Sequence, residues 1–198
     1  MDNAWKCIEK VLENNNGYIK TSEVEAMDIS RHVIKKYVDL GKLNLVRKGL
    51  YVSTEGFYDE FALLQARSAK AIYSYSTALY LLGLSDRVPN VFDLTFPRGT
   101  NATYLKKSNA VRCHYVDKNE YEVGITEVYS PQGAMVKVYN RERCICDLIR
   151  NKNQMDIQIY THAIKTYFKS KPDYRTLIKY GKIFGIVDQI RTYMEVLD

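Results

Sequence analysis

The segment from Ser30 to Tyr51 constrains the fold of this chain more than any other stretch. Its first half has apolar residues at helical spacing, which predicts a helix with one buried face and a basic opposite face. The apolar residues are Val33, Ile34, Tyr37 and Leu40. Ser30 can cap the first free amides, and Gly41 can adopt the left-handed conformation that ends a helix. We therefore expect a helix from Ser30 to about Leu40.

The residues after this helix predict a β-hairpin with a positively charged tip at Arg47-Lys48-Gly49. Its apolar residues are Leu43, Leu45 and Val46 on one arm and Leu50, Tyr51 and Val52 on the other. Two like charges at an exposed tip repel each other in a free protein but bind favourably to a phosphate backbone. The tip is therefore typical of a DNA-binding wing.

Positive charge is concentrated between residues 31 and 48. Six basic residues in this span are opposed by Asp39 alone, and they are Arg31, Lys35, Lys36, Lys42, Arg47 and Lys48. Residues 1–30 have the opposite balance, with three lysines against six carboxylates. The whole chain has a formal net charge of +6, which is compatible with a nucleic-acid partner without requiring one.

The elements around this segment predict a winged helix-turn-helix over residues 1–54. A first helix and a short strand occupy residues 3–20. Ser22 and Glu25 have capping-box spacing, which predicts a second helix ending near Asp28. Helix, strand, helix, turn, helix and hairpin in this order are typical of a winged helix-turn-helix domain.

Residues 55–198 predict a second domain, so the expected fold class is α+β. Segments of strand-like character cover residues 91–96, 111–115, 125–129 and 134–138. The turns between them favour a small, mostly antiparallel sheet. Four helices are expected after Arg141, which makes the C-terminal part helical.

No catalytic or metal-binding motif is recognisable in the chain. Glu-x-Lys, Asp-x-Lys and Gly-x-Ser-x-Gly are all absent, as is a glycine-rich phosphate loop. Cys113 and His114 would point to opposite faces of a strand, which argues against zinc. The acidic residues of the predicted sheet are expected at its surface, and they are Asp93, Glu120, Glu122 and Glu127. We expect no catalytic residues, metal or cofactor; a nuclease using Asp93 or Glu127 is the enzymatic alternative.

The chain has the pattern of a cytoplasmic protein. No apolar run approaches the roughly 20 residues that span a bilayer, and the first residues lack a signal-peptide pattern, so no membrane partner is expected. The cysteines lie in apolar or mixed patterns, which predicts buried thiols in a reducing compartment. They are Cys7, Cys113, Cys144 and Cys146.

Short motifs, taken in order, give the chain a resemblance to a known family. They are Gly17-Tyr18-Ile19, Gly41-Lys42-Leu43, Arg47-Lys48-Gly49-Leu50-Tyr51, Tyr75-Ser76-Thr77-Ala78-Leu79 with Leu82-Gly83-Leu84, and Asp93-Leu94-Thr95-Phe96-Pro97. In this order they resemble the AbiE-family antitoxins, called AbiEi, over most of the chain. The resemblance implies an N-terminal winged helix that represses its own operon. It also implies a C-terminal domain that counteracts a neighbouring nucleotidyltransferase-like toxin in abortive-infection phage defence.

The charge pattern and the helix-turn-helix order together predict which residues contact operator DNA. Arg31 and Lys35, near the helix start, are placed to reach base edges, and the hairpin tip is placed on the phosphate backbone. The predicted DNA-contacting set is Thr21, Ser22, Ser30, Arg31, His32, Lys35, Lys36, Lys42, Arg47 and Lys48. The AbiE family often has a basic residue where this chain has Leu45.

A second basic run lies near the C-terminus, where Asp173 alone interrupts it. Its members are Lys165, Lys169, Lys171, Arg175, Lys179 and Lys182. Three roles remain open for it: an ordinary helix surface, an accessory DNA contact, and docking to an acidic toxin surface.

The function we expect is therefore an antitoxin whose partners are double-stranded operator DNA and a cognate toxin, with direct toxin contact left open. The alternative is a plain winged-helix regulator whose C-terminal domain senses a ligand or dimerises.

Overall fold

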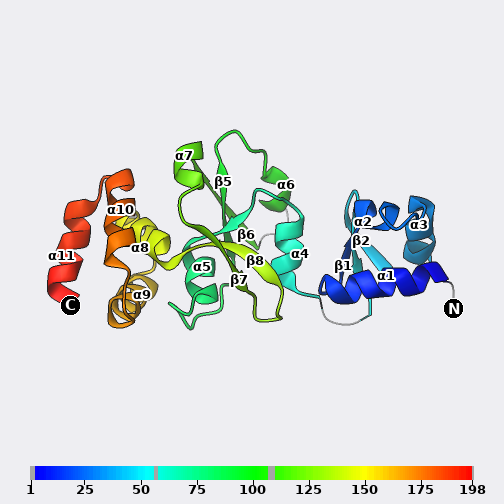
Figure 1. Cartoon of the computed structure of the whole chain (residues 1–198), viewed down its shortest axis with the longest axis horizontal. Helices are drawn as coiled ribbons and strands as arrows, with labels where there is room; N and C mark the ends of the chain where they lie inside the picture. Colours follow the sequence, from blue (N-terminus) through cyan, green and yellow to red (C-terminus); the bar gives the residue numbers. More distant parts are fainter. Residues whose placement is uncertain (1–2, 56–57, 107–109, 198) are drawn as a thin grey trace. The chain divides into compact units, whose positions relative to one another are not determined.

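The computed structural model describes residues 3–55, 58–106 and 110–197 and has an α+β fold (Figure 1). Its contacts divide the chain into two compact units. The first unit comprises Met1–Ala69 with Tyr129–Val136, and the second comprises Lys70–Val128 with Lys137–Asp198.

The first unit combines helices with a three-stranded sheet. Its elements are α1 (Asn3–Asn14), β1 (Tyr18–Lys20), α2 (Thr21–Glu25), α3 (Arg31–Asp39), β2 (Leu43–Arg47), β3 (Leu50–Ser53) and α4 (Glu60–Ala66). The strand order is β1-β3-β2, and both strand pairs are antiparallel. The register shifts between Leu45 and Arg47, which marks a β-bulge just before the hairpin turn.

Buried side chains from both helices and strands form the core of this unit. They are Trp5, Ile8, Leu12, Ile19, Val24, Ile34, Tyr37 and Leu43. Trp5 of α1 packs against Tyr37 of α3, with 4.4 Å between the ring centroids. Burying a large apolar side chain stabilises the folded state by about 1.5–3 kcal/mol relative to leaving it exposed. Apolar packing therefore fixes α3 against α1.

Helix α3 begins where the sequence predicts. The Ser30 hydroxyl accepts a hydrogen bond at 3.4 Å from the amide two residues further on, and Gly41 follows the helix with a φ of +71°. Ile34 and Tyr37 are buried, whereas Leu40 is the C-cap residue and is 60% exposed. The apolar face is shorter than predicted because the helix ends before Leu40.

The capping box predicted at Ser22 and Glu25 is wrong. Glu23 accepts a hydrogen bond from the Lys20 amide at 2.7 Å, and α2 begins at Thr21. Lys20 is also the last residue of β1, where it pairs with β3. The helix starts two residues earlier than expected because strand pairing decides where the extended backbone ends.

Asp59 connects the start of α4 to residues 129–136 within the first unit. Its side chain is 1% exposed, and one oxygen accepts a hydrogen bond from an amide in the first turn of α4 at 2.9 Å. The other oxygen accepts hydrogen bonds from the Ser130 hydroxyl and the Ala134 amide. The division between the units therefore differs from the predicted boundary at 54/55, because local sequence patterns do not reveal hydrogen bonds between distant residues.

The main sheet is five-stranded, with the order β6-β5-β4-β8-β7. Its strands are β4 (Ile72–Tyr73), β5 (Phe92–Pro97), β6 (Val111–Val116), β7 (Ile125–Tyr129) and β8 (Met135–Tyr139). Strand β5 pairs antiparallel with β4 and parallel with β6, and β4 pairs parallel with β8. The sheet is mixed, so the prediction of a mostly antiparallel sheet is wrong. Side chains alternate between the two faces in parallel and antiparallel strands alike, so the sequence pattern does not reveal the strand direction. The connections between the strands decide it.

The helices of the second unit include the four that the sequence predicts after Arg141. The elements are α5 (Tyr75–Leu81), α6 (Thr103–Lys106), α7 (Lys118–Tyr121), α8 (Arg141–Arg150), the 3-10 helix η1 (Lys152–Gln154), α9 (Ile157–Lys169), α10 (Tyr174–Phe184) and α11 (Val187–Leu197). Gly181 of α10 lies so close to Ile190 of α11 that an added Cβ would meet the Ile190 side chain at 2.5 Å. Within the described ranges, no helix combines the length and the apolar character needed to cross a membrane.

Candidate functional site

Helix α3 presents the basic surface that its sequence pattern indicates. The basic side chains Arg31, His32, Lys35 and Lys36 are all exposed. Ile34 and Tyr37, on the other side of the helix, are buried against the core. The buried pair fixes the rotation of the helix, so the basic side chains must point towards solvent.

The hairpin tip lies beside the start of α2. The Thr21 amide donates a hydrogen bond to the Gly49 carbonyl at 3.0 Å, which ties α2 to the tip. Arg47 and Lys48 are both exposed. The Arg47 guanidinium donates hydrogen bonds at 3.2 Å to the backbone carbonyls of Lys48 and Ala66. The backbone therefore already holds Arg47 in place, while its side chain stays accessible.

The remaining predicted contact residues differ in exposure. Ser22 and Ser30 are exposed, and Thr21 is partly buried. The Lys42 ammonium lies 4.3 Å from the centroid of the Trp5 ring, so its charge is directed at an aromatic face of the core. This geometry does not favour the phosphate contact that we expected for Lys42.

The second basic run is exposed along its whole length. Lys165 and Lys169 are on α9, Lys171 follows it, and the remaining three are on α10 at Arg175, Lys179 and Lys182. The α10 residues recur at helical spacing and lie on one side of that helix. Asp173, the interrupting carboxylate, caps α10 by accepting hydrogen bonds from the amide and hydroxyl of Thr176 at 3.0 and 2.6 Å.

The second unit contains a polar cavity of about 580 Å³, which we call the Asp93 cavity. Its lining comes from α5, β5, β6 and segments near residues 85–91 and 151–159. The charged and aromatic members of the lining are Tyr75, Arg87, Asp93, Arg112, His114 and Asp156. Sequence analysis did not predict this site.

Asp93 is a buried carboxylate whose neighbours are the guanidinium of Arg112 and the imidazole of His114. Its Oδ1 lies 2.8 Å from His114 Nε2 and 3.5 Å from a terminal nitrogen of Arg112. The parallel register of β5 and β6 pairs Asp93 with Arg112, which brings the three side chains together. The expectation that Asp93 is a sheet-surface charge is wrong, because only 1% of this residue is exposed. Its position between Phe92 and Leu94, in a strand whose one other polar side chain is that of Thr95, was the available signal.

Tyr75 occupies an unusual backbone conformation beside this carboxylate. Its φ is +44°, in the left-handed region that aromatic residues rarely adopt. Its ring packs on the His114 ring with 4.1 Å between the centroids, and its hydroxyl accepts a hydrogen bond from Asn151 Nδ2 at 3.2 Å. Burial raises the pKa of Tyr75 above its ordinary value, so the phenol stays protonated at neutral pH.

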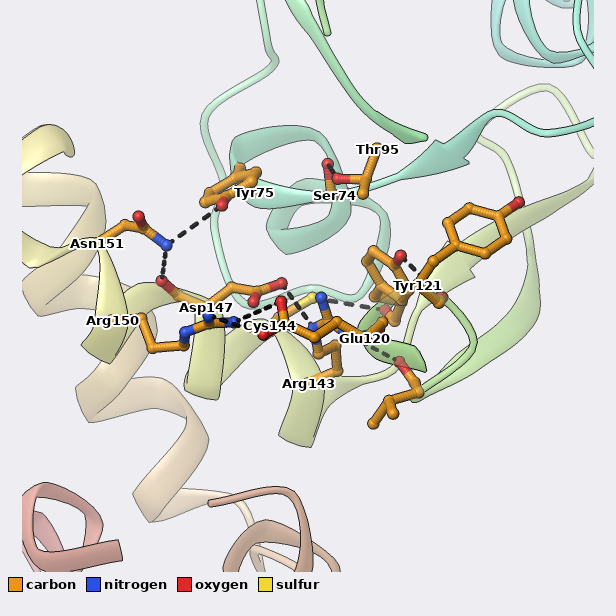
Figure 2. A network of polar contacts seen from close by, with 12 residues as sticks. Ser74, Tyr75, Thr95, Glu120, Tyr121, Arg143, Cys144, Asp147, Arg150 and Asn151 are labelled. Atoms are coloured by element: carbon orange, nitrogen blue, oxygen red, sulfur yellow. Dashed lines mark hydrogen bonds and ion pairs between the residues drawn. The ribbon is translucent and has the colours of Figure 1, made fainter. Parts of the chain in front are cut away.

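Figure 2 shows a second polar network, centred on Arg143 and Asp147 of α8. Arg143 is 1% exposed; its Nε donates to Asp147 at 2.9 Å, and a terminal nitrogen donates to the Val123 carbonyl at 3.1 Å. Arg150 binds both oxygens of Glu120 at 3.1 Å, and Glu120 lies on α7 rather than on the sheet where we expected it. This network attaches α8 to the segment around α7 and has a structural role.

The cysteines and acidic residues do not form a metal site in the part of the chain that the structure describes. No cluster there combines three or more histidine, cysteine, aspartate or glutamate side chains around one point. The four cysteines are not joined in disulfides; Cys144 and Cys146 are buried, and Cys7 and Cys113 are partly buried.

The fold and these two surfaces define an α+β protein with a basic helical face in one unit and a polar cavity in the other. No family model and no curated protein matches the sequence. Among solved structures, the chain is similar to that of the RV2827C protein from Mycobacterium tuberculosis. The TM-score is 0.63 with 12% identity, over 90% of this chain and 71% of that chain. At this identity the likeness concerns the fold alone.

Proposed function

We propose that the first unit is a winged helix-turn-helix domain that binds operator DNA, and that the chain is an autoregulating antitoxin of the AbiE type. The observation that supports DNA binding best is the position of α3. It follows α2 directly, precedes the β2–β3 hairpin, and has Arg31 and Lys35 exposed near its capped start. Helix α3 acts as the recognition helix, and the hairpin acts as the wing.

Two kinds of contact follow from this arrangement. Arg31 and Lys35 read base edges in the major groove, and Lys48 with Arg47 neutralises phosphates beside it. Both kinds are made by binding alone, so this function needs neither a catalytic residue nor a cofactor.

The antitoxin role rests on the sequence motifs that resemble the AbiE family. In this role the second unit counteracts a nucleotidyltransferase-like toxin encoded beside the chain, and its exposed basic run on α9 and α10 is a candidate surface for the toxin. In this role the chain prevents the growth arrest that the toxin would otherwise cause.

The two activities can be separated in the full-length chain. The first unit extends beyond residue 54 to Ala69, so deleting residues 1–54 would remove the Asn16 carbonyl that accepts from the Asp59 amide and the Arg47 side chain that donates to the Ala66 carbonyl. We therefore recommend the point variants Arg31→Gln and Lys35→Gln over a deletion. Lys10→Gln, an exposed lysine of α1, is the matched control.

Each variant is co-expressed with the neighbouring gene, and growth and operator binding are measured together. We expect Arg31→Gln and Lys35→Gln to lose operator binding while growth rescue is retained, and Lys10→Gln to retain both. Operator binding at wild-type strength in both α3 variants would disprove the recognition-helix assignment. A neighbouring gene whose expression does not arrest growth would disprove the antitoxin assignment.

A further inference from the structure

The Asp93 cavity shares no residue with the proposed DNA contacts. The protein engages the carboxylate acceptors of the cavity more fully than its donors. Both carboxylates in its lining are already engaged by the protein. Asp93 has His114 and Arg112 as neighbours. Asp156 accepts hydrogen bonds from two backbone amides of α9 at 2.8 and 3.2 Å and pairs with Arg87 at 3.3 Å.

The donors of the cavity are less fully used than its acceptors. Arg112 contacts Asp93 through one terminal nitrogen, and its side chain is 62% exposed. A guanidinium has five N–H groups, so Arg112 retains donors for a ligand. Because Nε2 of His114 donates to the Asp93 carboxylate, the other nitrogen of the neutral imidazole is an acceptor, so Arg112 rather than His114 is the cationic donor left for a ligand. A group that brings acceptors therefore complements this cavity better than one that brings donors.

The side chains that would meet such a ligand are held in place before it binds. Asp93 is fixed through its own amide, which donates to the Thr77 hydroxyl at 2.8 Å. His114 is held between this carboxylate and the ring of Tyr75. The left-handed φ of Tyr75 is a strained conformation, and such strain persists where surrounding contacts impose it, often at ligand sites. Preorganised groups of this kind lose little conformational entropy on binding.

We propose that the Asp93 cavity binds a small organic anion, whose phosphate or carboxylate group is held by Arg112. The cavity volume of about 580 Å³ lies within the range of small-molecule sites and far exceeds the size of an inorganic ion. A planar guanidinium binds either kind of oxyanion through paired hydrogen bonds. The amide side chains of Asn90, Asn151 and Gln154 contact the polar organic part of the ligand.

The test measures thermal stabilisation and calorimetric binding of the full-length chain with defined probes. Ribose 5-phosphate, adenosine monophosphate and citrate are the anionic probes, and ribose, adenosine and glycerol are their neutral counterparts. A ligand that binds the native state raises the melting temperature. We expect stabilisation by at least one anionic probe at millimolar concentration and none by its neutral counterpart. A response to the phosphates alone or to citrate alone identifies the oxyanion.

Variants then locate the binding in this cavity. Arg112→Gln should weaken the binding by about tenfold or more, because it removes a charge-assisted hydrogen bond. Arg98→Gln is the matched control, since Arg98 is an exposed arginine in the turn directly after β5 and pairs with Asp117 outside the cavity lining. In the wild-type chain, a bound probe should also protect Arg112 from modification by phenylglyoxal, as mapped by mass spectrometry.

Three results would overturn the proposal. They are no stabilisation by any anionic probe, equal stabilisation by the neutral counterparts, and binding that persists unchanged in Arg112→Gln. Failure of this variant to fold would leave the phenylglyoxal measurement on the wild-type chain as the deciding result. None of these outcomes depends on operator binding or on the rescue of growth from the toxin.

Discussion

Asp93 Oδ1 lies 2.8 Å from Nε2 of His114, at a position where the carboxylate is almost completely shielded from solvent. The contact joins β5 to β6 across a parallel strand pair. It places a charged group within a strand that is buried from Phe92 to Phe96, so hydrogen-bonding partners are needed to offset the cost of burying the carboxylate.

Asp93→Asn should destabilise the fold by about 1–3 kcal/mol, because His114 and Arg112 lose an ionised acceptor inside the protein. Urea denaturation monitored by circular dichroism measures the loss. Glu127→Gln is the control, since Glu127 is an exposed carboxylate on β7 and its replacement should cost less than about 0.5 kcal/mol. Equal stabilities of the two variants would contradict the buried role of Asp93.

Replacing the hairpin-tip cations should weaken operator binding and reduce its dependence on salt. For Arg47→Ala and for Lys48→Ala, we expect the slope of log K against log salt concentration to fall by nearly one unit, because each phosphate contact releases condensed counterions. Fluorescence anisotropy across a salt series measures this slope. Lys10→Ala should leave the slope unchanged, and an unchanged slope in both tip variants would exclude phosphate contacts at the tip.

Asp59→Ala should loosen the contact between α4 and residues 129–136. The substitution removes a helix cap and leaves the Ser130 hydroxyl and the Ala134 amide without this buried acceptor, with an expected loss of about 2–4 kcal/mol. Denaturant unfolding gives the size of the loss, and hydrogen exchange shows whether it is local to α4. Asp173→Ala, which removes an exposed cap from α10, should cost less, and the reverse order would contradict this account.

The cap of α10 should also weaken in acid. Hydrogen bonds from the Thr176 side chain and amide lower the pKa of Asp173 below its ordinary value. Because the carboxylate form is favoured in the folded state, this stabilisation is complete above the ordinary aspartate pKa of about 3.9 and is lost as the pH falls through the lowered pKa. Unfolding measured from pH 6 downwards should show a shallower acid dependence for Asp173→Asn than for the wild type.

The buried thiols should resist alkylation in the native protein. Burial raises the pKa of Cys146 to about 12 and raises that of Cys144 well above its ordinary value. The thiolate is the reactive form, so at pH 8 neither should react with iodoacetamide until the chain unfolds. Mass spectrometry with and without urea measures this difference at each cysteine. Rapid labelling of Cys144 or Cys146 in the native state would contradict their burial.

Local sequence patterns anticipated the elements whose signals lie within a few neighbouring residues. The spacing of Ile34 and Tyr37, with Ser30 before them, was sufficient to predict α3 and its exposed basic side. Strand β4 was missed because it has only two residues, both buried, and so shows no alternation. Asp93 was placed on the surface because a residue type alone does not reveal which partner a neighbouring strand supplies.

The sequence by itself determined the order of helices and strands within residues 1–54, the caps of α3 and the concentration of basic residues after Ser30, since each depends on interactions within a few turns of the chain. Tertiary structure decided the mixed direction of the main sheet, the attachment of α4 through Asp59, and the meeting of Asp93, Arg112 and His114. These features depend on contacts between residues that are far apart in sequence. Backbone pairing between β5 and β6, rather than any local pattern, brings the groups of the Asp93 cavity together.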